Sequence, residues 1–285
     1  EVKVVKVEAK ETKEQPPLLF DLTSLQQDAN KKYGYSADQT LNIAQTLYEK
    51  KVITYPRTGS RYIGEDVFEQ IESLFQHLAD TADEGIAAIS KNLIGAKLNK
   101  RSVDEKKVTD HHALLVTDEK PGAMLKEQQN IYNMIAKRMV ESFSEVCLKD
   151  ITTVTIDAKG VELIAKGTVI RQYGWRLSSD QIEIPDEDKN TDDQDNENAQ
   201  LPKLSAEEVL EILSLELSER FTKAKPIHTE ASLLKAMETS GKEIEDEEMR
   251  QAMKDCGLGT PATRAATIET LFQRDYIKRE KKKLI

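Results

Sequence analysis

The chain has 285 residues, of which 38% are hydrophobic and 32% are charged. This length allows two domains or one irregular body of several lobes, and the low apolar fraction favours a helix-rich protein with a large surface. No apolar run reaches the length of a membrane span and no signal peptide opens the sequence, so we expect no membrane partner. The two cysteines, Cys147 and Cys256, lie far apart, which indicates a reducing compartment rather than a disulfide framework.

The acidic residues are concentrated in two short segments. The net charge of −10 seems to argue against a nucleic-acid partner. However, residues 186–197 contain seven acidic residues and one lysine, and residues 242–248 contain five acidic residues and one lysine. The remainder of the chain is therefore close to neutral, and the distribution of charge, rather than its total, decides whether a phosphate-binding face exists.

The first half of the chain predicts a strand followed by a block of helices. Residues 1–14 alternate valines with lysines and glutamates, as in a half-exposed strand, and Pro16-Pro17 ends it. One helix is predicted from about Thr23, and another follows Ser36, which makes a capping box with Gln39. Amphipathic periodicity predicts further helices around 68–75, over 84–98 and over 126–145, which complete an α-rich block over roughly 27–149.

The connector Ile53-Thr54-Tyr55-Pro56-Arg57-Thr58-Gly59-Ser60-Arg61 is the most informative segment of this block. A proline pushes the preceding residue into extended geometry, so the Tyr55 phenol is expected to project from a short extended segment. The Arg57 guanidinium suits a phosphate, and a phenol beside cations is a plausible nucleophile for a phosphodiester. Taken alone, the segment fits better as a plain connector whose tyrosine packs on a helix and whose arginines are solvated.

A second segment, Asp110-His111-His112-Ala113-Leu114, follows a basic stretch at residues 100–107. A histidine can donate a hydrogen bond to a phosphate oxygen, and Asp110 would fix its tautomer or raise its pKa. The alternative is a surface pair at the start of a strand. We expect no zinc site, because His77 and His228 make no ligand cluster with this segment and no cysteine is close.

The second half of the chain begins with strands. Residues 152–156 and 161–165 flank the turn Asp157-Ala158-Lys159-Gly160 and predict a hairpin. Strand-like residues return over 209–217, and we expect all these strands to share one sheet with residues 1–14. The acidic segment 186–197 between them is predicted to be a disordered or mobile loop.

The last block, 227–285, is predicted to be helical. Within Gly257-Leu258-Gly259-Thr260-Pro261-Ala262-Thr263-Arg264, Thr260 fits an N-cap and Pro261 fits the first helical position. The free N–H groups of such a first turn can hold a phosphate, and Arg264 adds charge. An ordinary capped helix explains this segment slightly better on its own. Residues 276–283 are typical of a basic strand or wing after a helix pair, a layout used by DNA-binding proteins.

In this order and spacing, the three segments resemble the type IA DNA topoisomerases, most of all the bacterial topoisomerase III branch. The catalytic segment of that family is similar to Ile53-Thr54-Tyr55-Pro56-Arg57-Thr58, and its histidine segment is similar to His111-His112-Ala113-Leu114. Its final signature resembles Thr229-Glu230-Ala231-Ser232-Leu233 followed by residues 257–264. The resemblance covers the chain from about Pro17 to the end, and the ordered set of motifs is specific although each motif alone is weak.

The resemblance implies a role for each matching residue. Tyr55 would be the nucleophile that joins covalently to a DNA 5′-phosphate, Arg57 would stabilise charge on the scissile phosphate, and His111 would contact DNA near it. The other residues implied to bind single-stranded DNA are Thr58, Ser60, Arg61, Thr229, Thr260, Thr263 and Arg264. Transesterification conserves the phosphodiester energy, so no ATP is required, and the sequence holds no nucleotide phosphate-binding loop of the Gly-x4-Gly-Lys type. The implied location is the cytoplasm, at the bacterial nucleoid, and a protein partner of the acidic loop is unknown.

The implied fold is multidomain, with α and β parts: a fragment of a toroidal type IA topoisomerase core. Residues 1–28 and 150–222 would form a β-rich arch domain. Residues 29–149 would form an inserted helical gate domain that carries Tyr55. Residues 223–285 would form part of a helical, winged-helix-like base domain that binds DNA.

The sequence departs from the family pattern in two ways. Gly59 stands where the family usually has an acidic residue, which puts the role of that carboxylate in doubt. The family's N-terminal Toprim domain, which carries the ligands of Mg²⁺, is absent, and both ends of the sequence are typical of cuts in a longer protein. We therefore expect no metal bound by these residues, Asp193 and Asp195 to be solvated, and the fragment alone to be inactive.

Two other functions compete with the topoisomerase interpretation. A non-catalytic winged-helix DNA-binding module would explain residues 257–283 but leaves the Tyr55 segment unused. A scaffold with acidic interaction segments would explain residues 186–197 and little else. A covalent tyrosyl–DNA adduct separates the enzyme from both.

Overall fold

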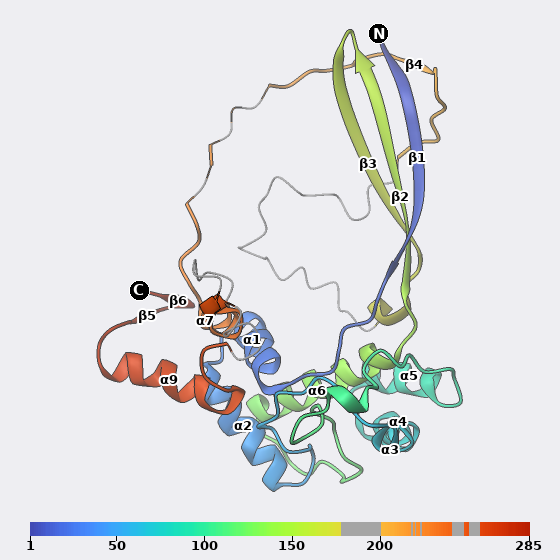
Figure 1. Cartoon of the computed structure of the whole chain (residues 1–285). Coiled ribbons are helices and arrows are strands. Elements are labelled where there is room, and N and C mark those ends of the chain that lie inside the picture. Colours follow the sequence, from blue (N-terminus) through green and yellow to red (C-terminus); the bar gives the residue numbers. More distant parts are fainter. Residues whose placement is uncertain (178–200, 218, 220, 223, 241–247, 251–256) are drawn as a thin grey trace. The chain divides into compact units, whose positions relative to one another are not determined.

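The computed structural model describes residues 1–285 except 178–200, 218, 220, 223, 241–247 and 251–256. The described residues form two compact units (Figure 1). The sheet unit contains residues 1–15, 145–177 and the described part of 201–226, and the helical unit contains residues 16–144 and the described part of 227–285. The predicted mixture of α and β structure is confirmed. The acidic segment 186–197, with Asp193 and Asp195, and Cys256 lie outside the described residues.

The sheet unit is built on one antiparallel sheet with the strand order β3-β2-β1-β4. Its strands are β1 (Val2–Glu14), β2 (Cys147–Ala158), β3 (Val161–Gln172) and β4 (Val209–Leu210). The hairpin between β2 and β3 turns at Lys159 and Gly160, both with positive φ, as a tight two-residue hairpin requires. The predicted hairpin and the shared sheet are confirmed, and the strands of the hairpin are longer than predicted.

The strand predicted over 209–217 is wrong beyond Leu210. β4 pairs only with Val2 and Lys3 at the start of β1. Residues 211–217 therefore face no strand within the described chain, and unpaired backbone does not form a ladder. Their alternating leucines are exposed instead.

The helical unit places its core around the long helix α6. Ile135 and Phe143 of α6 are fully buried, together with Leu25 of α1 and Phe75 of α4. Burial of each such side chain contributes about 1.5–3 kcal/mol to folding. The helices are α1 (Leu22–Tyr33), α2 (Ala37–Glu49), α3 (Glu65–Phe68), α4 (Ile71–Thr81), α5 (Glu84–Leu93), α6 (Lys126–Phe143), α7 (Glu230–Glu238) and α9 (Pro261–Gln273), with short 3₁₀ turns at η1 (Glu105–Lys107) in this unit and η2 (Gly174–Leu177) in the sheet unit.

The predicted cap at Ser36 is present in the structure. The Ser36 hydroxyl accepts the backbone N–H of Gln39 at the start of α2. Asp21 caps α1 and accepts the backbone N–H of Ser24, so α1 begins at Leu22, one residue before the predicted start near Thr23. After α9, β5 (Arg279–Glu280) and β6 (Lys283–Leu284) form a small hairpin, as the predicted wing requires.

The two compact units differ from the predicted domain boundaries. The sheet unit ends at residue 15 rather than 28, because Leu19, Phe20 and Leu25 are buried in the helical core. It resumes at residue 145 rather than 150, because β2 already begins at Cys147. The predicted gate and base fall within one unit, since buried side chains of α7 and α9 pack around Ala37 of α2. Within the described ranges, no helix is long and apolar enough to cross a membrane.

Candidate nucleic-acid cleavage site

The Tyr55 connector and the His111 segment are joined by backbone pairing. Ile53 and Val116 form an antiparallel bridge, and the Thr54 N–H donates to the Leu115 carbonyl at 2.9 Å. The Leu115 N–H in turn donates to the Thr54 hydroxyl at 3.0 Å. Two segments about sixty residues apart in the sequence are thereby held as one short ladder, which ends at Tyr55 on one side and leads back to His111 on the other.

Tyr55 and His111 lie in direct contact. Their ring centroids are 4.5 Å apart with an interplanar angle of 52°. Tyr48 of α2 also packs against the Tyr55 ring in an edge-to-face arrangement, at 5.3 Å between centroids. Tyr55 is half-buried and His111 is exposed, so the phenol is fixed by two aromatic neighbours and remains near the surface.

Arg57 and Gly59 bring the segment 257–264 to the same connector. Arg57 is exposed, and its Nη1 donates to the carbonyl of Ala262 at 3.5 Å. A Cβ atom added to Gly59 would lie 3.3 Å from Cγ of Pro261, so the absence of a side chain allows this close approach. All three motifs that the sequence singles out therefore meet within the helical unit.

Thr58 and Ser60 point into the protein. The Thr58 side chain is 1% exposed, and its hydroxyl donates to the His111 carbonyl at 2.9 Å. The Ser60 hydroxyl contacts the carbonyls of Lys107 at 3.0 Å and Tyr62 at 3.2 Å. Both side chains fasten the connector to residues 107–111, and their predicted contact with DNA stays a prediction.

Arg61 is held by two carboxylates. Its Nε lies 3.0 Å from Asp21 Oδ2, and its Nη2 lies 3.3 Å from Glu238 Oε1 on α7. Burial lowers the pKa of Arg61, but the charges of Asp21 and Glu238 outweigh it, so the pKa is raised above the usual value. The guanidinium joins the connector to α1 and α7 as a permanent cation.

Arg264 is buried, at 4% exposure, although the family resemblance implies that it binds single-stranded DNA. Its Nη1 donates to the Thr23 hydroxyl at 2.9 Å and its Nε donates to the Leu258 carbonyl at 3.2 Å. Burial lowers the pKa of Arg264, and Glu238 and Asp21 oppose this shift. The side chain closes the Gly257-Leu258-Gly259 turn and joins it to α1.

The three predicted threonines stand at helix starts. Thr229 caps α7 in a capping box with Ser232. Thr260 and Thr263 form a capping box at the start of α9, where both are exposed. The side chains of Thr260 and Thr263 remain accessible there, whereas the role of Thr229 in the described structure is to begin a helix.

Three acids help to position these elements, and the sequence predicted no site role for them. Glu230 is 2% exposed; its carboxylate accepts the Ala37 N–H of α2 at 2.8 Å and pairs with Arg279 at 2.5 Å. Asp21 and Glu238 hold Arg61 as described above. Two of them carried a sequence signal: Asp21 stands three residues before a serine at a helix start, which is a cap pattern, and Glu230 lies inside the family-like segment Thr229-Glu230-Ala231-Ser232-Leu233.

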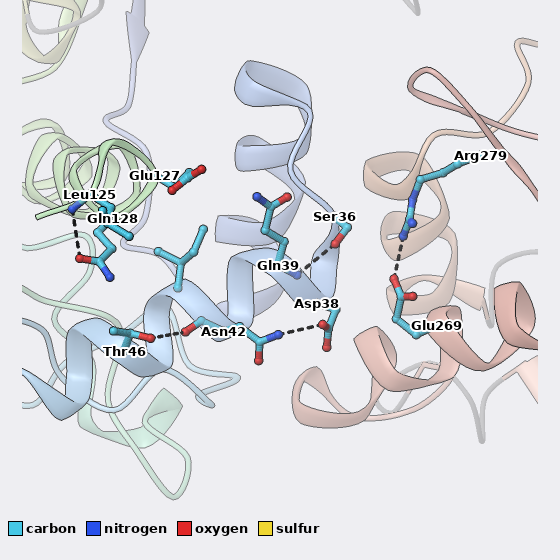
Figure 2. A pocket seen from close by; sticks show the side chains of 11 residues that line it. Ser36, Asp38, Gln39, Asn42, Thr46, Leu125, Glu127, Gln128, Glu269 and Arg279 are labelled. Atoms are coloured by element: carbon cyan, nitrogen blue, oxygen red, sulfur yellow. Dashed lines mark hydrogen bonds and ion pairs between the residues drawn. The ribbon is translucent and has the colours of Figure 1, made fainter.

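A separate open hollow of about 470 Å³ lies between α2, the start of α6, α9 and β5 (Figure 2). Its polar lining includes Asp38, Glu127 and Gln128, with Glu269 paired to Arg279 at 2.7 Å. None of the predicted site residues lines it, so the predicted chemistry does not depend on a deep pocket. Among the described residues, no group of three or more His, Cys, Asp or Glu side chains is arranged to hold a metal ion.

Comparisons with known proteins show the family of this chain. A family model described as DNA topoisomerase matches residues 1–285. The chain therefore belongs to the bacterial type IA DNA topoisomerase family, whose members are isomerases. It is 35% identical to DNA topoisomerase 3 of Bacillus licheniformis over 273 residues, which are 93% of this chain and 36% of that protein. It is 31% identical to DNA topoisomerase 3 of Vibrio cholerae over 283 residues, covering 98% of this chain and 42% of the relative.

A solved structure is similar over nearly the whole chain. The full-length topoisomerase I from Thermotoga maritima superimposes with a TM-score of 0.68 at 25% identity, covering 99% of this chain and 42% of that one. The predicted resemblance to type IA topoisomerases is confirmed. The chain spans about two fifths of the length of these relatives, so the activity of a whole protein is addressed below as a proposal.

Proposed function

We propose that the protein containing this chain changes DNA topology by cleaving one strand, passing DNA through the break and religating it, with Tyr55 as the nucleophile. The observation that carries the proposal is the contact of the Tyr55 ring with the exposed His111 ring in a chain of the topoisomerase family. Single-stranded DNA is the proposed partner, and the cytoplasm at the bacterial nucleoid is the proposed location.

The proposed reaction exchanges one phosphodiester for another. The phenolic oxygen of Tyr55 forms a bond to phosphorus while the bond between phosphorus and the 3′-oxygen of the neighbouring nucleotide breaks. The products are a 5′-phosphotyrosyl link and a 3′-hydroxyl, which takes up the equivalent of the proton that the phenol loses. Religation is the reverse reaction, so no ATP is consumed.

Two residues of this chain support the nucleophile. Arg57 is exposed beside Tyr55, and its planar guanidinium suits the non-bridging oxygens of the scissile phosphate. His111 is exposed beside the phenol and suits a hydrogen bond to a phosphate near the break. Thr260 and Thr263, exposed at the start of α9, are the further proposed contacts with the strand.

The described residues do not fit a magnesium site, because no acidic cluster accompanies Tyr55. We assign no step of the reaction to a metal bound by this chain. In this proposal Mg²⁺ belongs to a Toprim domain outside the sequence, and the chain alone does not relax DNA. Positioning and electrostatic stabilisation supply most of the catalysis of phosphoryl transfer, and part of the positioning groups would be lacking.

The proposed strand passage uses a toroidal core with a gate. Opening would separate residues 29–149 from residues 223–285, and that movement would break the pair of Arg61 with Glu238 and the hydrogen bond from the Ala37 N–H to Glu230. These contacts favour a closed gate, since each broken hydrogen bond to a charged group costs about 1.5–3 kcal/mol.

The test is Tyr55→Phe in a full-length topoisomerase carrying this sequence. Incubation with end-labelled single-stranded DNA, followed by denaturing electrophoresis, should give a covalent adduct with the wild type and none with the variant. DNA binding should be nearly unchanged, because the ring still packs against His111 and Tyr48. Tyr276→Phe, at an exposed position far along the chain, is the control and should form the adduct normally. An adduct formed by Tyr55→Phe would refute the assignment of the nucleophile.

A non-catalytic DNA-binding module is the second candidate. It is favoured by one observation: the β5–β6 hairpin directly after α9, which is the layout of a helix followed by a wing. The same adduct assay separates the two functions, because such a module binds DNA without a covalent link.

A further inference from the structure

We infer that Thr58 is a positioning residue of the proposed cleavage site, which acts through the backbone of His111 rather than on DNA. This inference rests on the proposed function of Tyr55 and His111. It starts from the burial of the Thr58 side chain, which is 1% exposed between the connector and the His111 segment.

The Thr58 hydroxyl is fully engaged inside the protein. It donates to the His111 carbonyl at 2.9 Å and accepts the Ser60 N–H at 3.1 Å. A hydroxyl has one proton to donate, so Thr58 cannot also donate to a phosphate while it holds His111. Thr58, which follows the proposed phosphate-binding Arg57, therefore uses its only hydroxyl proton to bind the His111 segment.

Thr58 is itself fixed from the other side. Its carbonyl accepts the N–H of Leu22, one of the free donors at the start of α1, at 3.0 Å. α1 belongs to the main core through Leu25. Thr58 therefore links the His111 backbone to the start of α1, and the helix fixes the position of that backbone.

The His111 ring depends on this backbone contact. The interactions found for its side chain among the described residues are limited to the ring contact with Tyr55 at 4.5 Å. Neighbouring anchors hold the loop at residues 107 and 113: Ser60 binds the Lys107 carbonyl, and the Ala113 N–H donates to the Tyr62 carbonyl at 2.9 Å. Thr58 makes the contact at His111 itself, so its loss should loosen the ring without releasing the whole loop.

The first experiment measures the position of the His111 ring directly. The chain has four histidines, so the ring signals in ¹H–¹³C NMR spectra are few, and His111→Gln identifies the one of interest. Thr58→Val keeps the shape and removes the hydroxyl, and it should move the His111 signals toward those of a histidine without an aromatic neighbour. Thr58→Ser keeps the hydroxyl and should restore the wild-type signals.

The matched control is Thr40→Val. Thr40 is fully buried in α2, and its hydroxyl also donates to a backbone carbonyl, that of Ser36, at 2.9 Å. It should lower stability as Thr58→Val does and leave the His111 signals in place. His111 signals unchanged in a folded Thr58→Val chain would overturn the inference. If Thr58→Val and Thr58→Ala both unfold while Thr58→Ser folds, the hydroxyl serves stability alone, and the inference is again overturned.

The second experiment uses the full-length enzyme. Thr58→Val should lower the rate of DNA cleavage about tenfold, which corresponds to the roughly 1.4 kcal/mol of one net hydrogen bond, and Thr58→Ser should restore it. DNA binding should change little, because Thr58 does not reach the DNA. Loss of binding with an unchanged cleavage rate for bound DNA would instead make Thr58 a DNA contact. If the Tyr55→Phe enzyme still forms an adduct, the proposed function fails, whereas the NMR result on Thr58 stands independently of it.

Discussion

The two units of this protein bury their residues very differently. In the helical unit, aliphatic and aromatic side chains from α1, α2, α4, α5 and α6 form one continuous core, and charged residues such as Glu230 and Arg264 are buried with partners. In the sheet unit, the fully buried hydrophobic side chains are few among the described residues, and Val161, Ile164 and Leu215 are exposed. The sheet is held chiefly by its long backbone ladders.

This difference explains where the proposed chemistry lies. A reactive phenol and its neighbours need side chains and loops that are held within fractions of an ångström, which only a dense interior provides. Every predicted site residue belongs to the helical unit. The sheet unit consists mainly of long strands and contains none of the predicted site residues.

This contrast predicts that loss of one ion pair lowers the free energy of unfolding much more in the helical unit than in the sheet unit. Glu230→Gln removes the charge that holds Arg279 and weakens the bond to the Ala37 N–H, and it should lower the free energy of unfolding by about 2 kcal/mol. Asp150→Asn is the matched change in the sheet unit, where Asp150 pairs with the exposed Arg171, and it should cost at most about 0.5 kcal/mol.

Urea titrations can follow the two units separately. Far-UV circular dichroism at helical wavelengths reports mainly the helical unit. The fluorescence of Trp175, the single tryptophan, reports the sheet unit. Equal costs for the two substitutions would contradict the picture of one dense and one open unit.

The second prediction places single-strand DNA binding on the helical unit. Arg57→Ala should weaken binding of a short single strand several-fold and reduce the slope of log affinity against log salt by about 0.7, because one phosphate contact is lost. Lys166→Ala removes an exposed cation from the sheet unit and should change neither value. Fluorescence anisotropy of a labelled strand over a salt series measures both.

The buried Arg264 provides an internal check of this experiment. Arg264→Met should reduce affinity, if at all, by loosening the start of α9, and it should leave the salt slope unchanged because the guanidinium is bonded to Thr23 and Leu258. A lower salt slope for Arg264→Met would instead support a direct contact of Arg264 with a phosphate, as the family resemblance implies.

The smallest expected effect is a pH dependence of the sheet unit. Burial raises the pKa of Glu14, but hydrogen bonds and charges from Arg176 and Lys149 outweigh it and lower the pKa below its usual value. A carboxyl with a lowered pKa in the folded state stabilises that state above its unfolded pKa, and this stabilisation is lost as the pH falls through the folded pKa. Glu14→Gln should therefore lower the free energy of unfolding at pH 7, measured by urea titration, by less than about 1 kcal/mol.

The difference between wild type and Glu14→Gln should shrink as the pH falls through the lowered pKa of the Glu14 carboxyl, because the wild-type carboxyl then becomes protonated as well. Trp175 fluorescence is the appropriate signal, since its Nε1 donates to the Glu14 carbonyl at 3.3 Å. A difference that stays constant down to pH 2 would show that the pairs with Arg176 and Lys149 do not stabilise the sheet unit.

The local elements and the family could be predicted from neighbouring residues and from the order of the motifs. Period-2 alternation in residues 1–14, the turn at Lys159-Gly160 and the cap at Ser36 depend on neighbouring residues, so the strand, the hairpin and the helix they predict are all present. The ordered motifs around Tyr55, His111 and Gly257 likewise led to the topoisomerase family, because the order and type of functional residues are properties of the chain alone.

The burial of polar residues and the identity of their partners could not be predicted in this way. Arg264 and Thr58 carry the same polar groups as the exposed Arg57 and Thr260, and nothing in their immediate sequence separates them. Their burial follows from partners far along the chain: Thr23 lies 241 residues from Arg264, and His111 lies 53 residues from Thr58. Such contacts form only when α1, the Tyr55 connector and α9 pack together, since a buried donor must find its acceptor across elements. For the same reason, the sequence could not place the predicted gate and base in one compact unit.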